Sequence, residues 1–204
     1  TEFALAMTIP AAVALIVIAT ALTQVLYQRG KFGAEDTYSV ALALAIYGAG
    51  LPAFVLHKVL QPLFYAREDS RSPFRYALIS MVVNVVLAVG LVGYIGFSAA
   101  AWATTLSGWI MVAQLWLGSR KMGDEARFDA RFLHRLPRIL AASALMAAAL
   151  YAGNILLDPW LATHGLRYAA LAILIATGMA TYGIAGTLLG AFRLSDFRSL
   201  RRQR

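Results

Sequence analysis

Five long stretches of the chain contain no charged residue, and they restrict its fold more than any other feature. A helix needs roughly 20 such residues to cross the hydrocarbon core of a bilayer, which is about 30 Å thick. The stretch over residues 76–119 is twice that length and can form two crossings if the chain turns back at residues 93–96, which read GYIG. We therefore expect an all-α polytopic membrane protein with about six transmembrane helices. The uncharged stretches are residues 3–28, 37–56, 76–119, 139–157 and 168–192.

The composition argues against a soluble protein of this size. Hydrophobic residues make up 60% of the chain and charged residues 14%, whereas roughly a quarter of the residues of a soluble domain are charged. A chain of 204 residues is too short to surround six wholly apolar helices with polar ones. We expect lipid to cover these helices, and we do not expect a soluble enzyme.

Basic residues gather in alternate connections between the expected helices. When successive connections are assigned to opposite sides, 15 of the 18 Lys and Arg residues fall on one side, against Arg29, Lys31 and Arg167 on the other. Short cytoplasmic connections retain positive charge, so both ends of the chain are predicted to be cytoplasmic. Because the basic residues do not form one patch, we expect membrane lipid and no nucleic acid as their partner.

A charged linker divides the expected helices into two groups. Residues 1–119 are expected to form four transmembrane helices, and residues 139–192 two more. The linker, residues 120–138, combines an apolar with a cationic face and should lie on the cytoplasmic membrane surface. Residues 193–204 form a basic cytoplasmic tail. The chain has no initiator methionine and its first apolar stretch is too long for a signal peptide, so we expect the C-terminal piece of a longer protein.

Several residues predict local features of these helices. Pro10 lies inside the first expected helix and should bend it nearby, because proline cannot donate a backbone hydrogen bond. Ser72 followed by Pro73 has the pattern of a helix N-cap and first helical position. Gly186 and Gly190 have a spacing that allows two helices to pack closely. Six polar residues of the 76–119 hairpin should face protein or water, namely Ser80, Asn84, Thr104, Thr105, Ser107 and Gln114.

The sequence lacks the usual catalytic and metal-binding patterns. It contains no cysteine, and His57, His134 and His164 lie in three different segments without a metal-binding spacing. The apolar stretches contain no acidic residue, so they offer no carboxylate for intramembrane proteolysis or for a proton relay. We therefore expect no enzymatic activity, no metal site and no organic cofactor.

One motif resembles a known family. Residues 58–73 read KVLQPLFYAREDSRSP, and the MurJ/MviN lipid II flippases typically show K-V-L-x-P-x-F-Y-A-R-x-D-x-x-T-P, with threonine where Ser72 stands here. Residues 26–32, which read LYQRGKF, and residues 35–37, which read EDT, also resemble a loop of that family. The helix layout is similar to the last six of the family's fourteen helices. The resemblance therefore covers essentially the whole chain.

The resemblance implies part of a transporter of the bacterial cytoplasmic membrane. Flippases of this family move an undecaprenyl-linked peptidoglycan precursor outward by alternating access during cell-wall synthesis. This chain would be the second lobe of a MOP-type transporter, helices nine to twelve, plus two extra C-terminal helices. The resemblance also implies an apolar groove, lined by residues 139–157 and 168–192, that would hold the lipid tail; an ordinary lipid-facing surface would have the same composition. The missing N-terminal lobe of the same protein would be its partner.

The resemblance and the charge distribution also suggest two sets of site residues. Lys58, Arg67 and Arg71 at the predicted cytoplasmic mouth are candidates for binding the pyrophosphate of the precursor, although topology alone would also place them there. Asn84 and Thr104 occupy positions of a cation site found in some members, but Ala88 stands in place of its acid, so the site would be incomplete. An interhelical hydrogen bond is their alternative role. A monovalent cation or the membrane potential would supply the driving force.

Two other functions stay open at this point. One is a cation-coupled drug or polysaccharide exporter of the same superfamily, which would share the helix layout. The other is a membrane scaffold that docks a partner through its glycine-rich last helix and its basic tail.

Overall fold

The computed structural model describes residues 2–28, 31–120, 130–161, 163 and 165–190. These residues form seven α-helices and no β-strand, which confirms the expected all-α class. The helices are α1 (Glu2–Val17), α2 (Ala19–Tyr27), α3 (Ala34–Tyr65), α4 (Arg71–Ile95), α5 (Ser98–Ser119), α6 (Ala130–Leu161) and α7 (Arg167–Leu188).

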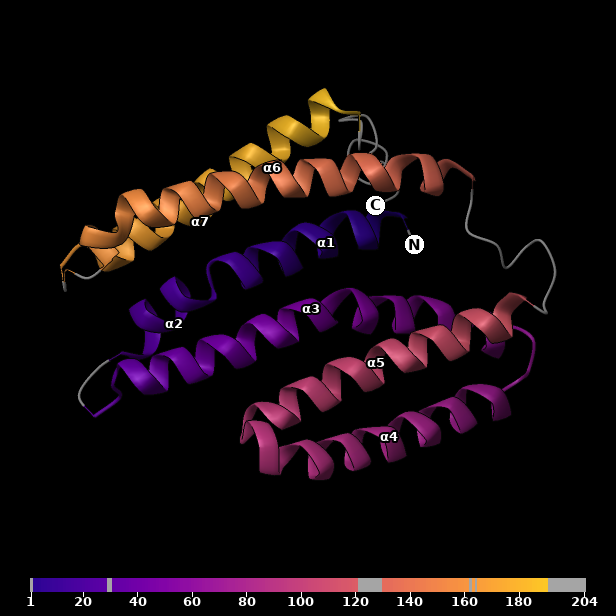
Figure 1. The fold of residues 1–204 in the computed structure, drawn as a ribbon. Helices are drawn as coiled ribbons and strands as arrows, with labels where there is room; N and C mark the ends of the chain where they lie inside the picture. Colours follow the sequence, from indigo (N-terminus) through magenta and orange to yellow (C-terminus); the bar gives the residue numbers. More distant parts are fainter. Residues whose placement is uncertain (1, 29–30, 121–129, 162, 164, 191–204) are drawn as a thin grey trace.

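The helices lie side by side as a row of rods (Figure 1). In Figure 1 α6 and α7 cross each other at one side of the molecule, and the bent rod of α1 and α2, then α3, α5 and α4 follow in that order. Consecutive rods in this order pack extensively on one another. α4 occupies one edge, packs mainly on α5 and leaves most of its apolar side chains exposed. The pair of α6 and α7 occupies the other edge.

Four helices are long and apolar enough to cross a membrane, namely α3, α4, α6 over Arg135–Leu161, and α7. α1 and α2 together form a fifth, broken span. α5 has 22 residues and runs antiparallel to α4 within one hairpin. It is less apolar because it contains Thr104, Thr105, Ser107 and Gln114. The six expected crossings thus correspond to six rods, five of which meet the criteria of length and hydropathy.

The first span bends at Ile18 and not near Pro10. α1 continues through Pro10, and the helix axis turns by 68° between α1 and α2. Ile18 is buried in an apolar cluster with Val25 of α2, Leu150 of α6 and Leu174 of α7. The bend thus lies at a residue that is buried against helices distant in the sequence, and no local pattern in the sequence reveals these contacts.

Side-chain bonds to the backbone join α3 and α5. Thr105 Oγ1 donates a hydrogen bond to the Ile46 carbonyl at 2.9 Å, and Trp109 Nε1 donates one to the Ala49 carbonyl at 3.1 Å. Thr105 is buried, which confirms for this residue that the polar side chains of the hairpin face protein. In an apolar medium such partners avoid the cost of unpaired polar groups.

The polar turn between α3 and α4 is capped differently from the prediction. α4 begins at Arg71, so Ser72 is already helical and is not the N-cap. The carboxylate of Asp69 accepts the backbone N–H of Ser72 at 3.0 Å. Hydrogen bonds from the Ser72 side chain and backbone stabilise the ionised carboxylate and thereby lower the pKa of Asp69. An acid three residues earlier therefore does the capping that the sequence pattern assigned to Ser72.

Gly190 ends a helix and does not pack two helices together. It lies just beyond α7 with a φ of 67°, a conformation that glycine adopts without steric cost. α6 and α7 approach closely at Gly178, where a Cβ would lie 2.8 Å from the Cδ2 atom of Leu150, and at Gly153, where it would lie 2.9 Å from Cδ1 of Leu174. Of the predicted Gly186–Gly190 pair, only Gly186 lies within the helix.

The hairpin turns where the sequence predicts it. α4 ends at Ile95, Gly96 has a φ of 61°, and α5 begins at Ser98. Residues 121–129 of the predicted linker lie outside the described residues. The rest of the linker, from Ala130 on, forms the first turns of α6. The basic tail at residues 193–204 also lies outside the described residues. The boundaries of linker and tail therefore stay predictions.

Candidate functional site

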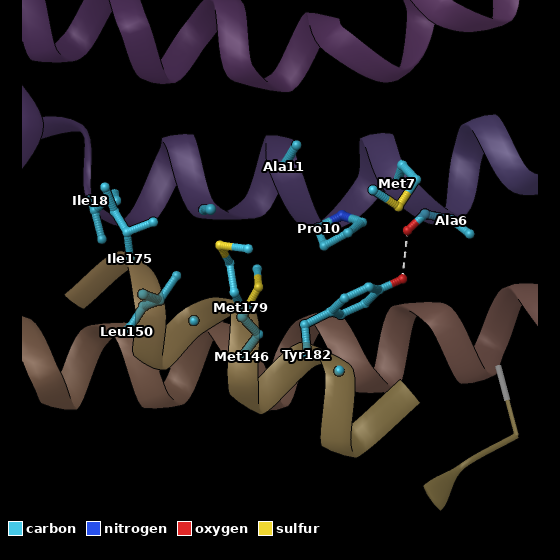
Figure 2. A pocket seen from close by; sticks show the side chains of 13 residues that line it. Ala6, Met7, Pro10, Ala11, Ile18, Met146, Leu150, Ile175, Met179 and Tyr182 are labelled. Carbon is cyan, nitrogen blue, oxygen red and sulfur yellow. Dashed lines mark hydrogen bonds between the residues drawn. The ribbon is translucent and has the colours of Figure 1, made fainter. Parts of the chain in front are cut away.

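An apolar cavity of about 410 Å³ lies between α1, α6 and α7. Figure 2 shows Met7 and Pro10 of α1, Leu150 of α6 and Met179 of α7 around it. Its volume falls within the range of about 300–1,000 Å³ that is typical of ligand sites. Among the lining side chains only Tyr182 has a polar group. Such a lining suits a hydrocarbon chain and would strongly disfavour a charged group.

The cavity corresponds to only part of the predicted groove. Residues 139–157 supply Met146 and Leu150, and residues 168–192 supply Ile175 and Gly178 among others. The third wall comes from α1, which the resemblance did not assign to the groove. The sequence offers no signal for this wall, because the α1 residues that line it have the same apolar character as the rest of that helix.

Asn84 and Thr104 meet between α4 and α5. The Nδ2 group of Asn84 donates to Thr104 Oγ1 at 3.3 Å and to Ser107 Oγ at 3.2 Å. The two hydroxyls donate in turn, Thr104 to the Ala100 carbonyl at 2.8 Å and Ser107 to the Thr104 carbonyl at 3.0 Å. The structure thus brings the two predicted residues together and adds Ser107, which the sequence presents only as one polar residue of the hairpin. In this arrangement the amide group of Asn84 joins α4 to α5, and both hydroxyls donate to carbonyls of α5.

Carboxylates do not contribute to this cluster. Ala88 lies one turn beyond Asn84 on α4, and no three His, Cys, Asp or Glu side chains gather into a potential metal site anywhere in the described part of the chain. The cluster offers the neutral oxygens of Asn84, Thr104 and Ser107. Neutral oxygen ligands without a carboxylate bring no negative charge to a cation.

The predicted basic residues gather around the connection between α3 and α4, at one end of the helix axes. Lys58 has an exposed side chain near the end of α3, Arg67 lies in the following turn, and Arg71 is the first residue of α4. The end of α5 lies at the same end (Figure 1), where the guanidinium of Arg120 stacks 3.8 Å from the ring centroid of Trp116. Exposed cations here can attract an anionic group. None of the three predicted residues lies on a helix that lines the apolar cavity.

Comparison with known proteins assigns the chain to a family. The family described as "Lipid II flippase MurJ" matches residues 1–176. The chain belongs to the MurJ family. A "Probable lipid II flippase MurJ" of Rhizobium meliloti (strain 1021) is 43% identical over 202 residues, which are 95% of this chain and 38% of that protein. A MurJ relative from Rhizobium tropici with the same description is 37% identical over 207 residues, which are 100% of this chain and 39% of that protein.

A solved MurJ structure has a similar fold. The structure titled "Lipid II flippase MurJ, inward closed conformation" matches with a TM-score of 0.72 and 25% identity, over 90% of this chain and 36% of that one. The resemblance drawn from residues 58–73 is therefore confirmed. The chain spans less than two fifths of the length of these MurJ relatives.

Proposed function

We propose that the chain is part of a lipid II flippase that moves an undecaprenyl-linked peptidoglycan precursor across the bacterial cytoplasmic membrane by alternating access. The observation that carries the proposal is the family match over residues 1–176, together with relatives that are described as lipid II flippases. The rest of the flippase, including its N-terminal lobe, would come from sequence beyond this chain. The protein would act as a transporter and not as an enzyme.

The apolar cavity between α1, α6 and α7 is the proposed place of the lipid tail. A flippase must keep a long hydrocarbon chain in apolar surroundings while the polar headgroup crosses the membrane, since transferring either part into the wrong medium costs free energy. Three methionines, Met7, Met146 and Met179, line the cavity. Their flexible, polarizable side chains can adapt to different positions of an irregular chain.

The basic residues around the connection between α3 and α4 are the proposed site of first contact with the headgroup. Lys58, Arg67 and Arg71 carry positive charge at the end where the connection between α3 and α4 lies. Arginine can form paired hydrogen bonds to a pyrophosphate, and several cations together raise the local concentration of an anion. In our proposal this end faces the cytoplasm, because cytoplasmic connections retain positive charge, and both ends of the chain lie there.

The hairpin cluster is the proposed point of coupling to an ion. If the amide of Asn84 turned its oxygen toward Thr104 and Ser107, three neutral oxygens would point into one space. Such a rotation of the Asn84 amide group would replace its two hydrogen bonds to Thr104 and Ser107 by contacts of all three oxygens with a cation. Neutral ligands suit a weakly bound monovalent cation. The membrane potential is the driving force in this proposal if the cluster binds no cation.

Transport in cells tests the proposed function. Cells depleted of their own lipid II flippase would receive the full-length protein that contains this chain, and precursor exposed at the outer membrane face would be measured. We expect exposure to be restored, and to fall when Lys58, Arg67 and Arg71 are replaced together by glutamine. A protein that inserts in the membrane but restores no exposure would contradict the proposal and favour a drug or polysaccharide exporter.

A further inference from the structure

At the cavity, the backbone carbonyl of Ala6 in α1 accepts a hydrogen bond from a side chain of another helix. Inside an α-helix each carbonyl accepts the N–H of the residue four positions later, and proline has no N–H to donate. Pro10 therefore leaves the carbonyl of Ala6 without its helical partner. The hydroxyl of Tyr182, which lies 176 positions later on α7, donates to this carbonyl at 2.5 Å. The bond supplies the partner that an unpaired backbone group in apolar surroundings requires.

This bond connects two walls of the cavity that otherwise pack on a third helix. α7 packs along α6, and α6 packs on α1, whereas α1 and α7 share no extensive contact of their own. Figure 2 shows Tyr182 reaching from α7 across to Ala6 at one end of the cavity, while Ile18 and Ile175 lie at the other end. Ala6 lies twelve residues before Ile18, the residue that follows α1, and this corresponds to about 18 Å at a rise of about 1.5 Å per residue.

We propose that Tyr182 is a positioning residue that closes one end of this cavity and sets the spacing of its α1 and α7 walls. With the bond to Ala6 formed, the cavity is closed at the Tyr182 end and open to a hydrocarbon chain elsewhere. With the bond broken, α7 can move away from α1 and the cavity extends past Tyr182. We call the Tyr182–Ala6 hydrogen bond the latch. The identity of the occupant as a polyprenyl tail rests on the proposed function, whereas the latch does not.

The strength of such a bond fits a contact that opens and closes. Side-chain hydrogen bonds between helices in a membrane shift a two-state equilibrium by about threefold on average and by about eighteenfold at most. A latch of this strength favours the closed cavity. It also leaves the open cavity populated, because a threefold to eighteenfold preference is small. Pro10 strengthens it, because opening the latch leaves the Ala6 carbonyl with no backbone donor.

Spin-label distances measure the latch directly. These 204 residues contain no cysteine. Once any cysteine elsewhere in the full-length protein is replaced, Ile16→Cys on α1 and Ile184→Cys on α7 carry two nitroxides at exposed positions. In the protein reconstituted in phospholipid vesicles, Tyr182→Phe should raise the ratio of long to short distances about threefold. Tyr151→Phe, which removes an exposed hydroxyl of α6, serves as the control and should leave the ratio unchanged.

Replacing Pro10 tests whether the effect of Tyr182→Phe comes from the lost bond to the Ala6 carbonyl. Pro10→Ala restores an N–H for the Ala6 carbonyl, so Tyr182→Phe should change the distance ratio less in the Pro10→Ala protein than in the parent. An equal change in both backgrounds, no change with Tyr182→Phe, or the same change with Tyr151→Phe would each overturn the proposal.

A lipid probe distinguishes the latch from the proposed occupant. Undecaprenyl phosphate added to the vesicles should raise the long-distance fraction of the parent protein, because its chain fills the cavity past Tyr182. If Tyr182→Phe opens the cavity but the lipid changes nothing, the latch is supported and the proposed binding of the tail is contradicted. If the lipid lengthens the distances but Tyr182→Phe does not, the opposite conclusion holds.

Discussion

Two glycines of α7 provide a test of how tightly α6 and α7 pack. At Gly178 a Cβ would lie 2.8 Å from Cδ2, 3.2 Å from Cγ and 3.3 Å from Cδ1 of Leu150, which is buried. At Gly183, five positions further along the same helix, no atom lies within 4 Å of the Cβ position. Gly178→Ala should therefore force Leu150 to move, whereas Gly183→Ala should occupy open space.

Two opposing effects set the size of the change in the free energy of unfolding. Replacing glycine by alanine stabilises a helix interior by roughly 0.5–1 kcal/mol at either position. Overpacking of a tight core costs about 1–3 kcal/mol, and this cost applies only at Gly178. We expect Gly183→Ala to stabilise the protein by about 0.5–1 kcal/mol. Gly178→Ala should be less stable than Gly183→Ala by about 1–3 kcal/mol.

Thermal unfolding of the two variants in the same lipid or detergent measures this difference. One kcal/mol corresponds to a shift in Tm of about 2–4 °C for a chain of this size. The Tm of Gly178→Ala should therefore lie about 2–12 °C below that of Gly183→Ala. Equal Tm values would refute the reasoning, because they would mean that the side chain of Leu150 turns aside at no cost.

Three further predictions concern single polar side chains. Thr105→Val removes the bond to the Ile46 carbonyl and should lower the free energy of unfolding by about 0.6 kcal/mol, and by about 1.7 kcal/mol at most, in the same melts. Asp69 has a lowered pKa, so its cap is fully formed above the ordinary pKa of an aspartate and is lost as the pH falls through the lowered value. Hydrogen-exchange protection of the Ser72 amide should fall over that range, and Asp69→Asn should remove this pH dependence. Sodium chloride should raise the Tm relative to choline chloride, and Asn84→Ala should remove the increase; an equal response in both proteins would exclude Asn84 from a cation site.

The corrected capping residue of α4 shows how close a local prediction can come. The polar turn before Pro73 marks a helix start, and the helix begins there. Ser72 and Asp69 both have side chains that can cap a helix, and their spacing alone does not decide between them. The backbone path of the turn decides, because it places the carboxylate of Asp69 at 3.0 Å from the Ser72 N–H.

The candidate site was predictable only in part. The composition and spacing of residues 84–107 indicate polar groups inside a hairpin, and the structure joins Asn84 to Thr104 and Ser107. The sequence alone does not reveal that α1 forms a wall of the apolar cavity or that Tyr182 bonds to Ala6. Both features depend on which faces of distant helices meet, and apolar residues cover nearly every face of these helices.

The sequence by itself determined the number and approximate position of the membrane-spanning helices, since a helix that crosses a membrane requires an uncharged stretch of matching length. Length and hydropathy account for the all-α class, the hairpin turn before Ser98 and the placement of most basic residues in alternate connections. Only the tertiary structure decided the order in which the rods pack, the bend at Ile18 and the hydrogen bond from Tyr182 to Ala6 at the cavity. Lipid is as apolar as a protein core, so hydropathy cannot tell a face that packs on another helix from a face that meets lipid. Close approach at small residues and single hydrogen bonds between helices make that choice.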